Sequence, residues 1–366
     1  MSERVFRSQP IGSLLRPAYL RDARRALRAG EISAARYKRI EDRAVDDALA
    51  LQEAAGLDII NDGEQRRMSF LGSLLEATEG LSRSSVVTQP WHEDDAHVVN
   101  LSLGLAVTGK VRQRRSLATE EFVYARARAR RPIKMTLPSP MMLKMFWSPQ
   151  ESTAAYRDPF EMFADGAAVI REEIAELARL GCEYIQIDAP ELTNLVDPEV
   201  RRVVFEERRI DPRRLLVEGV EILDSLAAHP GVTFGLHLCR GNNDGRWLAR
   251  GSYDSIAREV FQRARAYDEF LLEYDDSRSG SFEPLAEVPR DKLVVLGLVT
   301  TKRNVLETAD ELIARVEDAA RLFPKERLAL STQCGFASGV KGNPVEPAMQ
   351  ERKLALVADV ARRVWG

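Results

Sequence analysis

The chain is poor in histidine and cysteine, with four His and three Cys among 366 residues. An odd, small number of cysteines in a chain of this length does not form a disulfide framework, so we expect reduced thiols and a cytoplasmic protein. The opening "MSERVFRSQPIG" lacks the apolar segment of a signal peptide. No stretch approaches the ~18 apolar residues of a membrane span, so we expect no membrane partner.

A strong charge of one sign is also missing. The 53 Lys and Arg residues nearly balance 56 Asp and Glu, for a net charge of −3. This balance argues against a nucleic-acid or polyanion partner and leaves small molecules as the expected partners. The basic run "ARARARR" at 125–131 is typical of a solvated helix face or turn. No pattern indicates an oligomeric state.

Short apolar runs alternate with long amphipathic segments along most of the chain. The helix expected after Asp158 shows this best, because Asp158 can cap it, Pro159 suits its first turn and Gly181 can end it. Eight runs have the composition of buried strands: 5–13, 56–62, 132–140, 182–190, 231–239, 269–276, 292–301 and 327–335.

Eight such strand–helix units predict an α/β protein, a (β/α)8 TIM barrel formed by residues 1–366 as a single domain. An open, doubly wound sheet is the alternative, but no glycine-rich phosphate-binding fingerprint follows any strand. Residues 82–131 interrupt the pattern and predict an insertion. Within it, residues 96–111 alternate around Gly104 and predict a β-hairpin outside the parallel strands.

Polar side chains follow the predicted strands, at the end of a barrel where catalytic groups lie. Each one alone is typical of a helix cap or a loop charge, but their shared position predicts a common site. The residues are Ser13, Glu64, Asp188, His237, Cys239, Glu273, Asp275, Lys302 and Cys334.

His237 and Cys239 are two residues apart, so they share one face of a strand. Cys334 follows the last strand, and Glu273 or Asp275 offers a carboxylate from a strand between them. Nitrogen, sulfur and oxygen ligands of this kind suit a catalytic zinc ion, which keeps one position open. The alternative is a hydrogen-bonded interior histidine with two small buried thiols.

Two thiolates, an imidazole and a carboxylate would give a zinc complex a net negative charge. A substrate thiol bound there loses its proton yet stays electron-rich, which favours attack on carbon. Hydrolases prefer ligands that leave zinc more acidic. An alcohol dehydrogenase would need a nicotinamide-binding fold, of which the sequence has no sign. Cys182 precedes its strand and is expected in the core.

With these residues placed, the chain resembles the C-terminal catalytic barrel of the cobalamin-independent methionine synthase family. The resemblance implies a zinc-dependent TIM barrel that transfers a methyl group to the sulfur of homocysteine. It rests on an ordered series of segments: "QPIGSLLRP", "NDGEQRR", "KMTLPSPMML", "YIQIDAPEL", "GLHLCRGN", "EYDDSRSG", "LVTTK" and "LALSTQCGF".

The resemblance also implies residue roles. His237, Cys239 and Cys334 match the zinc ligands, and Glu273 matches the fourth ligand better than Asp275. The remaining matches concern an amino-acid substrate. They are Ile11, Gly12 and Ser13 for its carboxylate, and Glu64 and Asp188 for its ammonium. The alternative for these two acids is ion pairing with Arg66, Arg67 or Arg278 at the barrel mouth.

The chain departs from the family in two places. Its 366 residues hold one barrel, whereas the full-length synthase has two. The histidine expected after strand seven is replaced by "LVTTKRN", where Thr301 and Lys302 are the candidates for assisting the leaving group. Lys302 has the alternative of a solvated loop lysine.

Single-barrel relatives include epoxide–coenzyme M transferases, and if this chain had that activity, its Arg240, Arg246 or Arg278 would bind the sulfonate. The alternative for these arginines is surface or structural ion pairing. We therefore predict a zinc-dependent thiol methyl- or alkyltransferase for a homocysteine-like amino thiol, with Arg240 as a further substrate contact. An epoxide-opening thiol transferase and a non-catalytic barrel with structural zinc are the alternatives.

Overall fold

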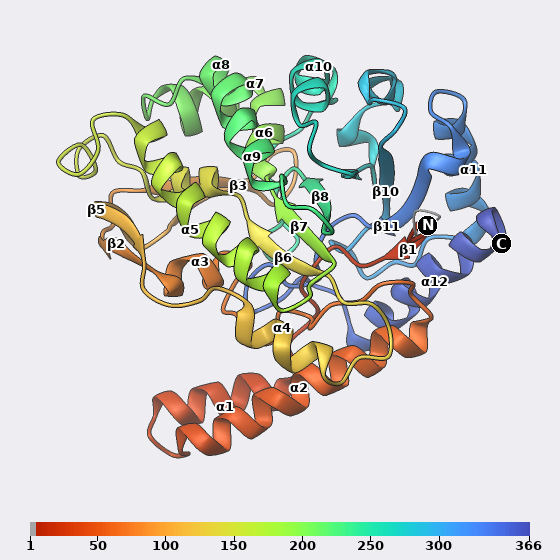
Figure 1. Ribbon diagram of the computed structural model, residues 1–366, viewed down its shortest axis with the longest axis horizontal. Helices are drawn as coiled ribbons and strands as arrows, with labels where there is room; N and C mark the ends of the chain where they lie inside the picture. Colours follow the sequence, from red (N-terminus) through yellow and green to blue (C-terminus); the bar gives the residue numbers. More distant parts are fainter. Residues whose placement is uncertain (1–4) are drawn as a thin grey trace.

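A computed structural model describes residues 5–366 and contains a curled sheet of seven parallel strands, surrounded by helices (Figure 1). This confirms an α/β fold and is consistent with a TIM-like barrel. Every neighbouring pair in the sheet is parallel. The order is β1 (Ser8–Gln9), β11 (Leu328–Thr332), β10 (Leu293–Val299), β9 (Glu269–Glu273), β8 (Thr233–Leu238), β7 (Tyr184–Asp188) and β6 (Met135–Pro138).

The strand predicted at 56–62 is reduced to one parallel bridge, between Ile60 and Ile133. The backbone N–H of Ile60 donates to the carbonyl of Pro132 at 3.0 Å, and that of Asp58 donates to the carbonyl of Ser8 at 3.1 Å. The segment therefore joins β6 to β1, the two edges of the sheet. After it, left-handed backbone at 63 and 64 turns the chain out of the strand direction.

The main outer helices are α2, α5, α10, α11 and α12, and α5 has the predicted ends. The side chain of Asp158 accepts from the N–H of Phe160 at 3.0 Å, Pro159 opens the helix, and Gly181 follows it with φ of +84°. The helices are α1 (Ala18–Arg28), α2 (Ala34–Ala55), α3 (Gly72–Ala77), α4 (Thr119–Arg126), α5 (Pro159–Arg179), α6 (Pro190–Thr193), α7 (Pro198–Val200), α8 (Pro212–Arg214), α9 (Val220–Leu226), α10 (Asp254–Arg263), α11 (Ala309–Ala320) and α12 (Pro347–Trp365).

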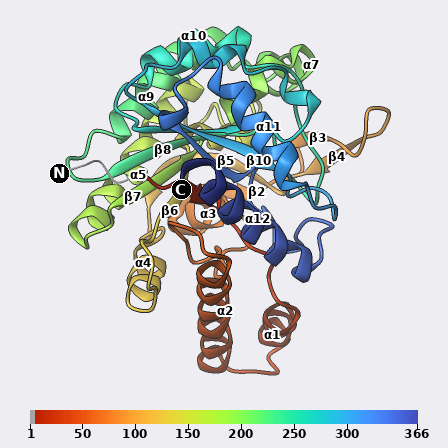
Figure 2. The same cartoon turned by 90° about the vertical axis from the view of Figure 1, so that its right-hand side faces the viewer.

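Helices α1 and α2 lie side by side and project away from the sheet (Figure 2). Their outer surface is polar, and the buried face of α2 includes Val45, Ala48 and Leu49. In the described part of the chain, no helix combines the length and apolarity needed to cross a bilayer.

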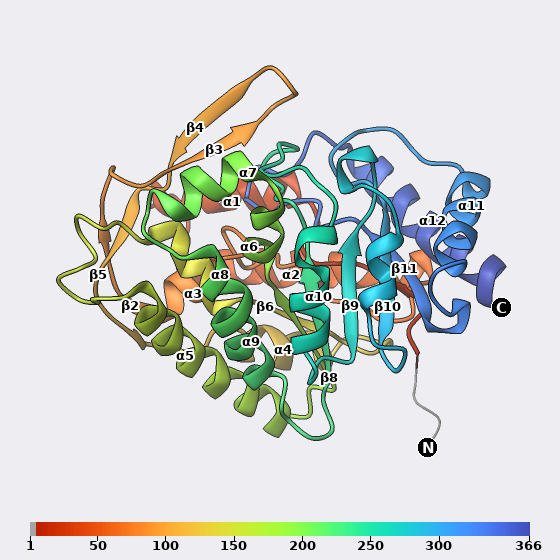
Figure 3. The same cartoon turned by 90° about the horizontal axis from the view of Figure 1, so that it is seen from above.

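The predicted hairpin around Gly104 is wrong. The strands on either side of Gly104, β4 (Val98–Ser102) and β5 (Leu105–Gln113), do not pair with each other. Instead β4 pairs with β3 (Thr88–His92), and β5 pairs with β2 (Thr78–Arg83), in two antiparallel ribbons. Alternation identified the strands, but the partner of β4 is set by the short turn at 93–97, where Asp94 accepts from the N–H of His97 at 2.9 Å. Figure 3 shows β3 and β4 projecting at one end of the molecule.

The returning end of this region is held by one buried carboxylate. Glu173 of α5 accepts hydrogen bonds from Ser116 Oγ at 2.8 Å and from three consecutive backbone N–H groups, those of Leu117, Ala118 and Thr119, at 2.7–2.9 Å. These groups belong to the start of α4. The carboxylate therefore fixes where the chain rejoins the barrel.

Replacing this carboxylate tests the anchor. In Glu173→Gln, one oxygen becomes an N–H₂ group that faces donors instead of accepting from them. We expect the free energy of unfolding to fall by about 1–3 kcal/mol, measured by urea denaturation. Glu172→Gln, at the exposed neighbouring position, is the control and should change it by less than about 0.5 kcal/mol. Equal midpoints for the two variants would contradict the anchor.

Candidate metal and substrate site

His237, Cys239 and Cys334 meet at the carboxyl ends of β8 and β11. Their potential ligand atoms lie within 4.8 Å of one another, and the two sulfurs are 4.0 Å apart. All three side chains are buried. Two strands separate β8 from β11 in the sheet, so only the curl of the sheet brings the residues together. The structure thus places the predicted His–Cys–Cys group at one point.

The orientation of His237 suits metal binding. Its Nδ1 lies 3.2 Å from the carbonyl oxygen of Leu271, which can only accept, so Nδ1 carries the proton. Nε2 is then an acceptor; it is buried and, among residues 5–366, has no hydrogen-bond partner. A backbone carbonyl on one imidazole nitrogen is the usual way of directing the other toward a metal. One nitrogen and two sulfurs are a donor set that zinc accepts.

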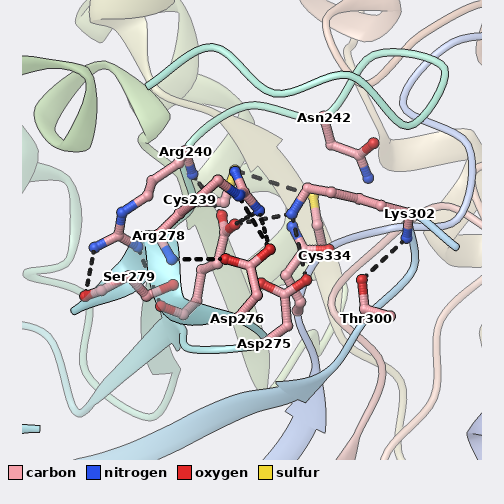
Figure 4. Close-up of polar contacts among 12 residues, drawn as sticks. Cys239, Arg240, Asn242, Asp275, Asp276, Arg278, Ser279, Thr300, Lys302 and Cys334 are labelled. Carbon is pink, nitrogen blue, oxygen red and sulfur yellow. Dashed lines mark hydrogen bonds and ion pairs between the residues drawn. The ribbon is translucent and has the colours of Figure 1, made fainter. Parts of the chain in front are cut away.

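The predicted carboxylate ligands lie beside this group but outside it. Glu273 is fully buried, with Oε1 2.8 Å from Lys302 Nζ and Oε2 accepting from the backbone N–H of Arg240 at 2.6 Å. Its negative charge is among those that raise the pKa of the Cys239 thiol. Asp275 lies 3.5 Å from the same Lys302 Nζ. Figure 4 shows Asp275, Arg278 and Lys302 in the charged cluster next to Cys239 and Cys334.

Three predicted contact residues are turned away from the substrate side. The guanidinium of Arg240 donates to the carbonyls of Gly251 at 2.8 Å and Glu273 at 3.1 Å, which makes it a tie between backbone segments. Thr301 donates to Gln333 Oε1 at 2.9 Å. Lys302 is buried against Glu273 rather than solvated. None of the three lines the pocket described next.

A pocket opens over the His–Cys–Cys group, and the predicted amino-acid contacts line it. The charged side chains among the described lining residues are the carboxylates of Glu64 and Asp188; neither Lys nor Arg is present. The lining residues are Ile11, Gly12, Ser13, Glu64, Phe70, Gln89, Trp91, Met142, Met145, Asp188, Pro190, Asn194, His237, Cys239, Gly241, Asn242, Leu248, Cys334, Gly335 and Ser338.

Glu64 is held in a strained backbone conformation, with φ of +52°. Its Oε1 accepts from Thr136 Oγ1 at 2.8 Å and lies 3.6 Å from Arg67. The alternative of an ion pair with Arg67 is therefore partly realised, although Arg67 is also bound to Glu121 at 2.7 Å. The second oxygen, Oε2, is buried and has no hydrogen-bond partner in the described chain.

Asp188 ends β7 and faces the same pocket. Its Oδ1 accepts from Gln186 Nε2 at 2.7 Å. Burial raises its pKa to about 7, and the negative charge of Glu64 adds to the rise, whereas His237 opposes it. Arg278, an alternative partner, is paired with Asp276 at 2.6 Å instead. Two carboxyl groups that share a pocket without a cation favour a positively charged ligand.

Two lining residues come from the insertion, which sequence reasoning left unassigned. Gln89 and Trp91 lie two apart on β3 and point to one side of it, and the Gln89 Oε1 is buried without a partner among residues 5–366. The ribbon is held there by a bridge between His92 and Trp247, whose rings stack at 4.1 Å. The alternation in "TQPWH" was the available signal, but it does not say what the strand covers.

Comparisons with known proteins identify the family of this chain. Residues 6–355 match the family model described as "Cobalamin-independent synthase, Catalytic domain". YxjH and YxjG of Bacillus subtilis (strain 168), both uncharacterized, are 34% and 33% identical over 98% of this chain and 95% of their own length. The 5-methyltetrahydropteroyltriglutamate–homocysteine methyltransferase of Rhodococcus jostii (strain RHA1) is 26% identical, and the chain spans 43% of it.

Two solved structures have the same fold as this chain. A putative vitamin-B12 independent methionine synthase from Listeria monocytogenes superposes with a TM-score of 0.73 at 26% identity, covering all of both chains. A B12-independent methionine synthase from Shewanella sp. W3-18-1 also gives 0.73, at 20% identity over 99% of this chain and 98% of that one, and supports the fold alone.

The pairing of Lys302 with Glu273 can be tested through stability. In Lys302→Met, the buried carboxylate loses its closest cation, so we expect the free energy of unfolding of chelator-treated protein to drop by about 3–5 kcal/mol. Arg303→Met removes an exposed cation 3.5 Å from Asp276 and is the control. A loss no larger than that of the control, in guanidinium denaturation, would show that Lys302 does not balance Glu273.

Proposed function

Because the chain belongs to the family of the cobalamin-independent synthase catalytic domain, we propose that it moves a methyl group to the thiol of a homocysteine-like amino acid, with zinc as cofactor. One observation carries the proposal. His237, Cys239 and Cys334 form a possible metal-binding group in the wall of a pocket that Glu64 and Asp188 also line. A thiol-activating centre and a site for a cationic substrate group are thus adjacent.

His237, Cys239 and Cys334 would hold the zinc ion, and we assign Glu273 as the fourth ligand in preference to Asp275. The support is that Glu273 Oε2 accepts from the backbone N–H of Arg240, the residue next to Cys239, at 2.6 Å. Zinc in this sulfur-rich set lowers the pKa of a substrate thiol while leaving its sulfur electron-rich for attack on carbon.

The residues of the chain do the rest of the work by orientation. Asp188 and the free oxygen of Glu64 bind the substrate ammonium, and the backbone of Ile11–Ser13 binds its carboxylate. The thiol end of the same molecule then points at His237, Cys239 and Cys334, which line the same pocket. Holding the reacting sulfur in one place in this way supplies much of the rate enhancement of a transfer reaction.

The pocket favours an amino thiol over a sulfonate thiol such as coenzyme M. A sulfonate needs Arg or Lys side chains, and the described lining has neither. Arg240 is occupied with backbone carbonyls, and Arg246 pairs with Glu93 at 2.5 Å. A purely structural zinc is disfavoured too, because such sites are closed, whereas this group borders a pocket.

We assign Thr301 and Lys302 to support of the site rather than to contact with a leaving group. Lys302 holds Glu273 at 2.8 Å, and Thr301 accepts from Asn242 Nδ2 at 3.3 Å. Asn242 itself lines the pocket. Neither Thr301 nor Lys302 lines the pocket.

Metal analysis tests the ligand assignment. We expect about one zinc ion per chain in the unmodified protein, and well below that in Cys239→Ser and Cys334→Ser, because each variant loses a thiolate ligand. Cys182→Ser is the matched control. That thiol is also buried, but it donates to the carbonyl of Tyr184, at the opposite end of β7 from Asp188. Full zinc and full activity in both site variants would overturn the assignment.

A thiol-consumption assay tests the reaction. Homocysteine and coenzyme M would each be combined with methylfolate, methylcobalamin or a small epoxide, and loss of free thiol followed. We expect homocysteine to be consumed with at least one methyl donor, because Glu64 and Asp188 match its ammonium, and coenzyme M to react at least tenfold more slowly. Preferential consumption of coenzyme M with an epoxide would instead support the alternative of an epoxide-opening thiol transferase.

A further inference from the structure

A layer of polar side chains lies inside the sheet, and two of its members, Gln9 and Gln186, come two residues before the pocket-lining residues Ile11 and Asp188. Its five members are 4% exposed or less, and none lines the pocket. Barrel interiors are normally filled by branched apolar side chains, and a buried polar layer is costly unless all its groups are paired. The members are Gln9, Lys134, Tyr184, Gln186 and Glu269.

Lys134 is the centre of this layer. Its Nζ donates to Gln9 Oε1 at 3.0 Å and to Gln186 Oε1 at 2.7 Å. Gln9 in turn donates to Glu269 Oε2 at 3.1 Å, so an amide joins the buried cation to the buried anion. Burial lowers the pKa of Lys134 to about 7, which Glu269 and Asp188 oppose. Either protonation state has N–H groups for both acceptors.

The contact with Lys134 decides which way Gln186 faces. Because Oε1 of Gln186 is bound to a donor, its N–H₂ group points to the opposite side. There it donates to Asp188 Oδ1 at 2.7 Å and to the carbonyl of Ile11 at 2.9 Å. One amide group therefore connects a carboxylate on β7 to the backbone that follows β1. Both of these connected groups line the pocket.

We propose that Lys134 and Gln186 are positioning residues that set the spacing between the ammonium subsite and the carboxylate subsite. The inference rests on the proposed function, whose substrate is a thiol with an α-amino acid head group. Ammonium and carboxylate sit on the same carbon in such a molecule, so their distance is fixed. Lys134 acts through Gln186, and Gln186 acts through Asp188 and Ile11; neither touches the substrate.

The test compares homocysteine with 4-mercaptobutanoate, which has the same thiol and carboxylate but lacks the amine. In Lys134→Met, the amide of Gln186 is free to rotate and present its oxygen to Asp188, which repels it. We expect the preference for homocysteine, as the ratio of the two kcat/KM values, to fall at least tenfold. The fall should come mainly from the KM of homocysteine. We expect the zinc content to change less than threefold, and kcat/KM to fall less for 4-mercaptobutanoate than for homocysteine, because only homocysteine has an ammonium for Asp188.

Two further variants keep the test decisive if Lys134→Met folds poorly. Gln186→Leu should lose the same preference, because it removes the hydrogen bonds to Asp188 and to the carbonyl of Ile11 at once. Lys134→Gln should restore part of it, because its side-chain N–H₂ can still donate to Gln186. Lys353→Met is the control for loss of a buried lysine. Lys353 lies on α12 and is bound to Glu307 at 2.8 Å. It should reduce stability and keep the preference.

The outcomes separate the two proposals. If the Lys134 and Gln186 variants slow both thiols equally, or keep the wild-type preference, the layer only supports the fold and the inference is overturned. If the unmodified protein consumes neither thiol with any methyl donor, the proposed function fails, and the positioning role fails with it.

Discussion

The curl of the parallel sheet is the constraint on which the site depends. Cys239 and Cys334 are 95 residues apart in the chain and follow strands that are not neighbours, yet their sulfurs lie 4.0 Å apart. The same curvature brings the loop after β1 to face Asp188 on β7. A flat sheet of the same order would separate β8 from β11 by about 14 Å, at the usual spacing between strands. Donors from distant segments meet only because the sheet turns back on itself.

Charge is distributed unevenly around this meeting point. The cations Lys302 and Arg278 surround Glu273 and are kept out of the pocket, whereas the carboxylates of Glu64 and Asp188 line it. A buried carboxylate with its own cations offers nothing to a substrate, and one without them attracts a positive group. Glu273 therefore has its own cations, whereas Asp188 and the Oε2 atom of Glu64 face a pocket whose described lining has no Lys or Arg, which favours an ammonium over an anion.

Much of this arrangement was predictable, because it follows from local periodicity. Seven of the eight predicted strands form, and the rule that residues two apart share a strand face placed His237 with Cys239. What failed depends on contacts between segments distant in sequence. Alternation around Gly104 identified β4 and β5 but not their partners.

The same limit applies to individual side chains. Nothing local in "LVTTKRN" shows that Lys302 lies against Glu273, and a lysine after a turn looks solvated in sequence. The burial of Lys134 is equally hard to predict, since the residue type does not show whether a lysine is buried or exposed. The partners that make such burial tolerable lie on other strands, Gln9 on β1 and Gln186 on β7. Sequence reasoning therefore recovers the His–Cys–Cys group and the strand ends, and misses the residues that hold them.

Several buried polar groups around the pocket are hydrogen-bonded, whereas some polar atoms of the residues that line it are not. Lys302 with Glu273 and Lys134 with Gln186 are satisfied, while Glu64 Oε2 and His237 Nε2 have no hydrogen-bond partner among residues 5–366. Each such buried atom costs stability, and the strained backbone at Glu64 adds to that cost. A ligand that bonds to these atoms binds only the folded state, so its binding free energy offsets the stability that the unpaired atoms cost. The paired residues around the pocket hold the site in place, so Glu64 Oε2 and His237 Nε2 do not move toward partners within the protein and stay available to a ligand.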